Sequence, residues 1–212
     1  MLKIYKTEEQ IIEEREQLEE GVWVQMTSPS MEESQKIADY FDIDITDIRA
    51  ALDDVETYIT VPLGILLTQG AIITVCTEET PVLQHFVKRR VRDFSTKKKM
   101  RFVYQILFQT AALYQSDLRI IDKKRTAIEE RVGENTEDED LIDLHSLEST
   151  LVYFATSLRS NATVLDRLTR YKRLEQYPDD RELLDDVIVE IRQARCWSGI
   201  SSHCSGGCPK SN

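Results

Sequence analysis

The sequence has little cysteine, histidine, glycine or proline, and it has no long apolar run. Only one of its four cysteines, Cys76, lies before residue 196. This distribution excludes a disulfide framework and is typical of a reducing compartment. No stretch approaches the roughly 18 consecutive apolar residues of a membrane-spanning helix, and the N-terminus lacks the apolar core of a signal peptide. Seven glycines and five prolines in 212 residues favour long, uninterrupted elements.

Motifs of catalysis are missing as well. The sequence contains no P-loop, no nucleophile elbow and no glycine-rich dinucleotide turn. Its three histidines are His85, His145 and His203. The first two fall within helical patterns, where surface or interface positions are the simpler interpretation. We therefore expect a protein that is not an enzyme and that carries no catalytic cofactor.

Acidic residues outnumber basic ones, and the formal net charge is −11. Nucleic acid is not an expected partner, because phosphate binding needs clustered lysine and arginine. An acidic surface attracts cations instead. The basic cluster from Lys97 to Arg101 begins a predicted helix and is interpreted as solvated surface.

Strand and helix signals alternate in the first third of the chain. The runs "LKIYK" and "GVWVQM" predict strands, and "VPLGILL" with "IITVC" predicts an antiparallel hairpin. The segment "SPSMEESQKIADYF" predicts a helix with two alternative starts. These are a Ser28 cap followed by Pro29, or a capping box of Ser30 and Glu33. "TDIRAALDD" predicts a second helix, and "TPVLQHF" a third that is capped by Thr80.

From about residue 95 the pattern predicts two long helices, at 96–132 and 140–173, joined by the acidic loop "GENTEDED". Residues in both helices recur at steps of three and four, the heptad spacing of an antiparallel helical pair. Asn161 is a polar member of the second seam. It either fixes the register of the helices or contacts something beyond the partner helix. The seams are Leu107, Ala111, Tyr114, Leu118, Ile121, Arg125, Ile128 and Val132, and Leu144, Leu147, Leu151, Phe154, Leu158, Asn161, Leu165 and Leu168.

The C-terminal segment "RCWSGISSHCSGGCPKSN" differs from the rest of the chain. Its glycines and its proline interrupt helices, so an irregular tail is expected there. Four of its residues are zinc-ligand types, but their spacing fits no common C-x2-C pairing. We interpret them as part of a flexible, oxidisable tail. These four residues are Cys196, His203, Cys204 and Cys208.

Several stretches, in order, resemble the cytoplasmic domain of the CorA family of magnesium transporters. They are "VWVQMTSPSMEE", "ALDDVE", the "VPLGILL" and "IITVC" hairpin, "TPVLQHF", "LVYFATSLRSN" and "LLDDVIVEIRQA". The resemblance implies an α/β fold, in which an N-terminal α/β lobe with a central mixed sheet is followed by long antiparallel helices and the start of a stalk helix. The implied boundaries are 1–94 for the lobe, 95–178 for the helical pair and 179–195 for the stalk. Residues 196–212 do not resemble that stalk and are expected to be an irregular, non-native tail.

The sequence departs from the family at two points. In "DDVETYITVPLG" an acidic segment runs directly into a strand, whereas relatives usually carry further strands between them. Either the domain is trimmed at Thr57–Tyr58, or residues that form those strands are absent from the sequence there. The Gly-Met-Asn motif of the family's pore and a membrane helix are both missing. The chain therefore looks like a soluble fragment from the cytoplasmic face of the membrane. Its full-length transporter would be a membrane-embedded pentamer.

The resemblance also implies that weakly bound, regulatory Mg²⁺ lies between subunits, held by acids on the stalk and on the neighbouring lobe. Such a site would sense internal Mg²⁺ and gate the pore. Asp186 matches the stalk acid best, and Glu190 and the neighbouring Asp185 are the other candidates on that helix. The candidates on the lobe are Asp47, Asp53 and Asp54. From the residues alone, acids near helix starts favour a simpler interpretation, which is that they complement the helix dipole and maintain solubility.

Two further functions remain open beside a Mg²⁺ or Co²⁺ transporter domain. A related zinc-transporter branch shares the fold, and the pore residues that would separate the two branches are not in the sequence. A free-standing, soluble helical adaptor would bind partner helices through its heptad seams. The divalent-cation transporter domain is the function that we expect.

Overall fold

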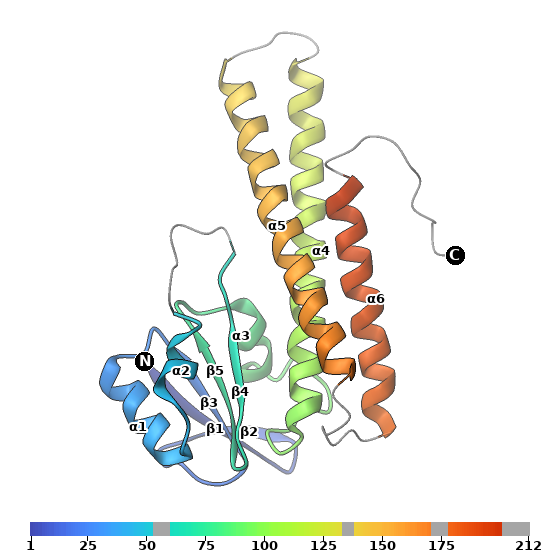
Figure 1. Ribbon diagram of the computed structural model, residues 1–212. Helices are drawn as coiled ribbons and strands as arrows, with labels where there is room; N and C mark the ends of the chain where they lie inside the picture. The colour runs from blue at the N-terminus through green and yellow to red at the C-terminus, as the bar shows by residue number, and fades with distance from the viewer. Residues whose placement is uncertain (53–59, 133–137, 171–177, 201–212) are drawn as a thin grey trace. The chain divides into compact units, whose positions relative to one another are not determined.

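The computed structural model describes residues 1–52, 60–132, 138–170 and 178–200 (Figure 1). Two compact units divide the chain. The first comprises Met1–Ile106 with Glu175–Asp180, and the second comprises Leu107–Leu174 with Arg181–Asn212. The elements are β1 (Leu2–Glu8), β2 (Ile11–Arg15), β3 (Val22–Thr27), α1 (Met31–Phe41), α2 (Ile45–Arg49), β4 (Gly64–Leu67), β5 (Ala71–Cys76), α3 (Pro81–Val87), α4 (Lys99–Val132), α5 (Asp138–Arg170) and α6 (Pro178–Ile200).

The first unit is built on a mixed sheet with the strand order β2-β1-β3-β5-β4. β3 and β5 are parallel, and every residue of both is buried, while the other neighbouring strands pair antiparallel. The predicted central mixed sheet and the predicted β4–β5 hairpin are confirmed. β2 was not predicted, because only Ile12 of this strand is buried and three of its five residues are charged.

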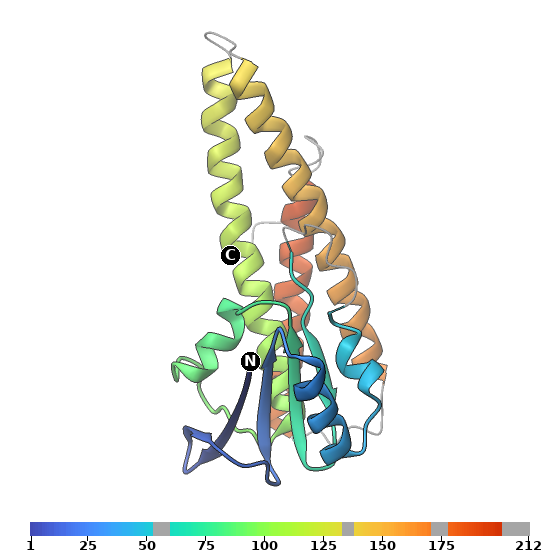
Figure 2. The same ribbon diagram turned by 90° about the vertical axis from the view of Figure 1, so that its left-hand side faces the viewer.

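Helices cover both faces of this sheet. Figure 2 shows α1 and α2 on one side of the strands and α3 on the other. Residues alternate between the two faces along a strand, and β3 follows this rule. Val22, Val24 and Met26 pack into an aliphatic core with Ile37 of α1 and Ile48 of α2. On the opposite face the core is aromatic.

Trp23 lies at the centre of the aromatic core and is fully buried. Its ring centroid is 5.0 Å from that of Tyr5 and 5.0 Å from that of Phe102. Its indole Nε1 donates a 2.8 Å hydrogen bond to Thr74 Oγ1 on β5. Burial, reinforced by Glu14 and Glu79, raises the pKa of Tyr5 to about 12, so this phenol stays neutral at physiological pH. Phe86 and Phe94 complete the ring cluster.

The structure chooses between the two predicted starts of α1. Ser30 is the N-cap, and its Oγ accepts a hydrogen bond from Glu33 N at 3.1 Å. In return, Ser30 N donates to Glu33 Oε2 at 3.0 Å. The capping box is therefore the correct alternative. The shorter second helix, α2, begins at the cap Asp44 and ends at Arg49.

Glu33 gives the first unit a measurable acid dependence. The backbone N–H of Ser30, aided by the N-terminal ammonium, lowers the pKa of Glu33. Because the folded pKa lies below the unfolded one, the stabilisation exists above the unfolded pKa and is lost as pH falls through the folded pKa. Replacing Glu33 by glutamine is expected to cost about 0.3–1 kcal/mol near neutral pH. The difference from wild type should disappear in acid, as measured by urea unfolding over a pH series.

Glu32→Gln is the matched control for that experiment. Glu32 is exposed in the same first turn, and it therefore reports the helix-dipole effect without the reciprocal hydrogen bond. If Glu32→Gln and Glu33→Gln changed the acid profile equally, the hydrogen-bonded carboxylate would have no special role.

The second unit is helical, and its seams confirm the predicted heptads. Leu118 and Ile121 of α4 pack with Leu151, Phe154 and Leu158 of α5 in one buried cluster. Every predicted seam position of α5 is buried or half-buried, including the half-buried Asn161. The polar residue in the apolar pattern therefore occupies a partly buried seam position. Both interpretations of Asn161 stay predictions.

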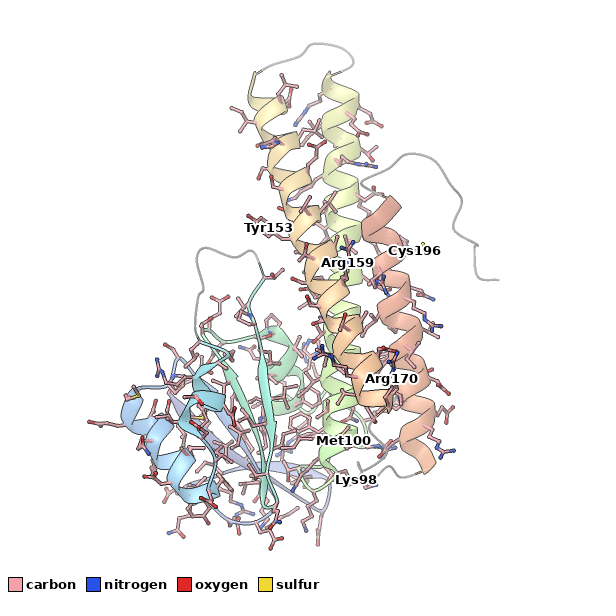
Figure 3. The ribbon with its side chains drawn as sticks, in the orientation of Figure 1. Lys98, Met100, Tyr153, Arg159, Arg170 and Cys196 are labelled. Atoms are coloured by element: carbon pink, nitrogen blue, oxygen red, sulfur yellow. The ribbon has the colours of Figure 1, made fainter. Side chains whose placement is uncertain are left out.

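α6 corrects one prediction. α5 ends at Arg170, and α6 begins at Pro178. α6 then continues to Ile200, so an irregular segment from residue 196 is wrong for 196–200. Cys196, labelled in Figure 3, lies within this helix. Near the end of α6, Trp197 makes a cation–π contact with α4: the Arg119 guanidinium carbon lies 5.7 Å from the indole centroid.

Several predictions fall outside the described residues or remain predictions. The expected trimming at Thr57–Tyr58 lies outside them, as do His203, Cys204 and Cys208. The domain boundaries at residues 94 and 178, and the non-native origin of the tail, stay predictions. Across the described part of the chain, no helix combines the length and the apolar character that a membrane crossing requires.

Candidate cation-binding site

Two of the three predicted stalk acids, Asp185 and Asp186, lie on α6 away from its buried face. In the second unit, Leu184, Val187, Ile191 and Ala194 recur at steps of three and four and are all buried. This spacing places them on one side of a helix. Asp185 and Asp186 fall between these positions and are exposed. The described residues supply no ion-pair partner to either of them.

Glu190 differs from these two aspartates, because it is half-buried and already has a partner. Gln115 of α4 donates from Nε2 to Glu190 Oε2 at 2.5 Å and to the Glu190 carbonyl oxygen at 3.2 Å. A cation that used Glu190 would compete with this amide. Asp185 and Asp186 are therefore exposed, whereas Glu190 links α6 to α4 through its hydrogen bond with Gln115.

The lobe candidates are only partly described. Asp47 is exposed in the first turn of α2, whereas Asp53 and Asp54 lie outside the described residues. Asp44 caps this helix, and its Oδ1 accepts hydrogen bonds from Thr46 N at 2.8 Å and Thr46 Oγ1 at 2.7 Å. These bonds lower the pKa of Asp44. Asp47, beside this cap, is placed to complement the helix dipole.

The described residues do not form a complete metal site within one chain. Among them, no three histidine, cysteine, aspartate or glutamate residues come together as a metal-binding group. Mg²⁺ retains several waters and needs only one or two carboxylates. A site at Asp185 and Asp186 would therefore take its remaining ligands from water or from another chain.

Two basic residues in the first unit have roles that were not predicted from the sequence. The Lys97–Arg101 cluster is not uniformly solvated surface. Lys99 Nζ donates to the carbonyl oxygen of Thr68 at 2.6 Å and also to that of Gln69. Arg101 Nε lies 3.1 Å from Asp180 Oδ1, and these side chains are only 14% and 2% exposed. In the sequence, the apolar Met100 and Phe102 alternate with Lys99 and Arg101, which is a pattern that could have indicated partial burial. Both apolar residues are buried in the structure.

Solved structures share this arrangement of a mixed sheet followed by long helices. The complete CorA magnesium transporter from Methanocaldococcus jannaschii matches with 18% identity and a TM-score of 0.82 over 95% of this chain and 73% of that one. The soluble domain of CorA from the same organism matches with 19% identity and a TM-score of 0.81 over 95% and 92%. The ZntB cytoplasmic domain from Vibrio parahaemolyticus matches with 10% identity and a TM-score of 0.61 over 94% of each chain.

These likenesses define the fold as that of the soluble domain of CorA-type metal transporters. The profile of the CorA-like Mg²⁺ transporter protein family matches residues 51–201. The chain therefore belongs to this family, which is a family of transporters rather than of enzymes. The family resemblance and the α/β fold expected from the sequence are confirmed. No curated protein sequence gave a significant match to the chain.

Proposed function

We propose that this chain is the cytoplasmic regulatory domain of a CorA-like divalent-cation transporter, and that it senses Mg²⁺ at the interfaces of a pentamer. The observation that carries the proposal is the exposed Asp185–Asp186 pair on α6. Both carboxylates lie opposite the buried seam of that helix, and neither is used in an ion pair of the described chain. Their oxygens are therefore available to a cation that another subunit also contacts.

The proposed mechanism is electrostatic linkage between cation binding and assembly. Each chain carries a formal net charge of −11, so neighbouring subunits repel one another. Hydrated Mg²⁺ between them would offset this repulsion and favour a closed ring. At ten times the dissociation constant, one site stabilises its bound state by about 1.4 kcal/mol. Five such sites would be sufficient to bias a two-state gate.

The candidate acids of the proposed site differ in how accessible their carboxylates are to a cation. Asp186 is the first candidate, with Asp185 beside it, because both carboxylates are exposed. Glu190 ranks lower because Gln115 already binds it. Asp47 is the described lobe acid that a neighbouring subunit would contribute. Asp53 and Asp54 are further candidates for that contribution.

The ligand chemistry favours Mg²⁺ over Zn²⁺ in this proposal. The exposed groups on α6 are carboxylates, which are hard oxygen donors of the kind that Mg²⁺ prefers. Zinc sites in proteins usually include cysteine or histidine ligands. The fold shared with the ZntB domain does not by itself decide between the two ions.

Replacing Asp186 by alanine is expected to weaken the response of the protein to Mg²⁺. In wild type the unfolding midpoint should rise with Mg²⁺ concentration, because binding to the folded state stabilises it by mass action. In Asp186→Ala the half-saturating Mg²⁺ concentration should increase at least fivefold. Differential scanning calorimetry over a Mg²⁺ series, with sedimentation velocity to follow assembly, measures both effects.

The matched control is Glu148→Ala, which removes an exposed acid from α5 and changes the net charge by the same amount. This variant should retain the wild-type Mg²⁺ response. Identical responses of wild type, Asp186→Ala and Glu148→Ala would show that Asp186 is not a ligand. Mg²⁺ would then act only by general screening of the negative charge.

A further inference from the structure

A cavity of about 290 Å³ lies in the first unit, between the β1–β2 turn and the loop after α3. The turn and the loop both lie at the left of Figure 2. The buried rings of Phe86 and Phe94 form its apolar wall, while Gln10, Arg89 and Arg92 line its polar side. We propose that this cavity binds a small organic anion, a phosphate or carboxylate carried on a compact apolar ring. The site is separate from the acids of α6, and the proposal does not depend on the proposed Mg²⁺ function.

Arg89 occupies a backbone position that normally belongs to glycine. At the end of α3, Arg89 N donates to Phe86 O at 3.0 Å and Arg90 N donates to His85 O at 2.9 Å. This pair of hydrogen bonds is the Schellman motif, whose first residue beyond the cap adopts a left-handed conformation. Arg89 has φ 56°. A long side chain is therefore placed where glycine would be unstrained.

Gln10 is a second residue of this kind. Glu8 pairs with Ile11 in the β1–β2 hairpin, so only two residues form the turn. Both have positive φ, 47° at Glu9 and 67° at Gln10. Such a turn usually contains Asn-Gly or another pair that tolerates this conformation. In this protein the second turn residue is Gln10 instead, and Gln10 lines the same cavity as Arg89.

The two strained positions point to a function for the cavity. Glycine would relieve the strain at either position, but it would remove a guanidinium or an amide from the cavity wall. Asp93, a third residue with positive φ (53°), also lines this cavity. Strained residues cluster at binding sites, where surrounding structure maintains them. Gln10, Arg89 and Asp93 come from two separate segments of the chain and line one cavity. This arrangement is the main support for a ligand site.

The charge of the surrounding segment favours an anion. Arg89 uses Nη2 to donate to Ile12 O at 3.2 Å, and a guanidinium has further N–H groups to offer. In the described chain, the guanidinium of the exposed Arg92 is not in an ion pair with any acid. Guanidinium groups bind phosphate and carboxylate with paired hydrogen bonds. Basic residues of the segment 88–101 outnumber its one acid, and they are Lys88, Arg89, Arg90, Arg92, Lys97, Lys98, Lys99 and Arg101.

The size of the cavity and the position of Asp93 limit the ligand further. Cavities for drug-sized ligands begin at about 300 Å³, so this cavity suits one ring with one anionic group. Phe86 and Phe94 offer that ring an apolar surface. Asp93 opposes an anion, and its replacement by asparagine should therefore tighten anion binding. These features distinguish a shaped site from a general basic surface.

Isothermal titration calorimetry of the full 212-residue chain with phenyl phosphate, benzoate and inorganic phosphate tests the proposal. Wild type should bind one equivalent of phenyl phosphate or benzoate, and the tighter of the two identifies the anionic group. Arg92→Gln should weaken binding at least tenfold. Gln10→Gly should also weaken binding, while its unfolding midpoint stays equal to or above that of wild type because the turn is relieved. The matched control is Arg90→Gln, which removes an exposed neighbouring charge that does not line the cavity and should change affinity less than twofold.

Three outcomes would overturn the proposal. The first is the absence of saturable binding of both ring compounds at millimolar concentration. The second is equal loss of affinity in Arg90→Gln and Arg92→Gln, which would indicate a non-specific basic surface. The third is inorganic phosphate binding as tightly as phenyl phosphate, which would leave no role for the aromatic wall. Asp186→Ala should not alter the titration, so failure of the Mg²⁺ function and failure of this proposal are distinguishable.

Discussion

Replacing Asp180 by alanine is expected to destabilise the first unit by about 3–5 kcal/mol, because it removes one partner of a buried ion pair. The Asp180 side chain is 2% exposed, and its carboxylate lies 3.1 Å from Arg101 Nε. Without it, the Arg101 guanidinium stays in a largely buried position and loses this carboxylate. Urea unfolding followed by Trp23 fluorescence, in a Trp197→Phe background, measures the loss in the unit that contains both residues.

Two further variants make the Asp180 prediction specific. Asp185→Ala removes an exposed aspartate from the same helix and should change the free energy of unfolding by less than about 0.5 kcal/mol. The double variant Arg101→Met with Asp180→Leu should recover much of the loss, since apolar residues of similar volume often replace buried ion pairs well. Equal effects of Asp180→Ala and Asp185→Ala would contradict the prediction.

Replacing Trp23 by alanine is expected to cost about 3–5 kcal/mol, the range for large aromatic residues in cores. The indole is fully buried, contacts four aromatic rings and donates a hydrogen bond to Thr74. The replacement removes these contacts and leaves a cavity beside the central strands. Thermal unfolding by calorimetry should show a large decrease in the midpoint of the first unit.

The second tryptophan is a matched control for that replacement. Trp197 is 43% exposed near the end of α6, and its described aromatic interaction is the contact with the Arg119 guanidinium. An exposed cation–π contact contributes about 0.5–1 kcal/mol. Trp197→Ala should therefore cost no more than about 1 kcal/mol. If both replacements cost the same, burial of Trp23 would not be what stabilises the sheet unit.

The parts of the fold that follow local periodicity could be predicted from the sequence. The steps of three and four along α4 and α5 identified which side chains are buried, because the two faces of a long helix differ in polarity. The β4–β5 hairpin was predictable from two apolar runs around a glycine turn. β2 was not, since an edge strand can be formed largely of charged residues that face solvent.

Features that depend on distant residues could not be predicted. Lys99 and Arg101 belong to a polar cluster in the sequence, and only the fold brings them to the Thr68 carbonyl and to Asp180. The choice between two caps for α1 was likewise decided by a reciprocal hydrogen bond. For the candidate cation site, the sequence identified acids on α6. It could not show that Glu190 is bound by Gln115 whereas Asp186 is exposed.

The Arg101–Asp180 pair also constrains the order in which the protein can fold during synthesis. Domains generally fold as units, the N-terminal part first, as the chain leaves the ribosome. The carboxylate that pairs with Arg101 follows α4 and α5 in the chain. The strands and their covering helices therefore emerge long before this contact can form. A nascent chain that stops before residue 180 lacks the carboxylate that pairs with Arg101. Its sheet unit should therefore be incompletely packed, and contacts between such distant residues also form slowly.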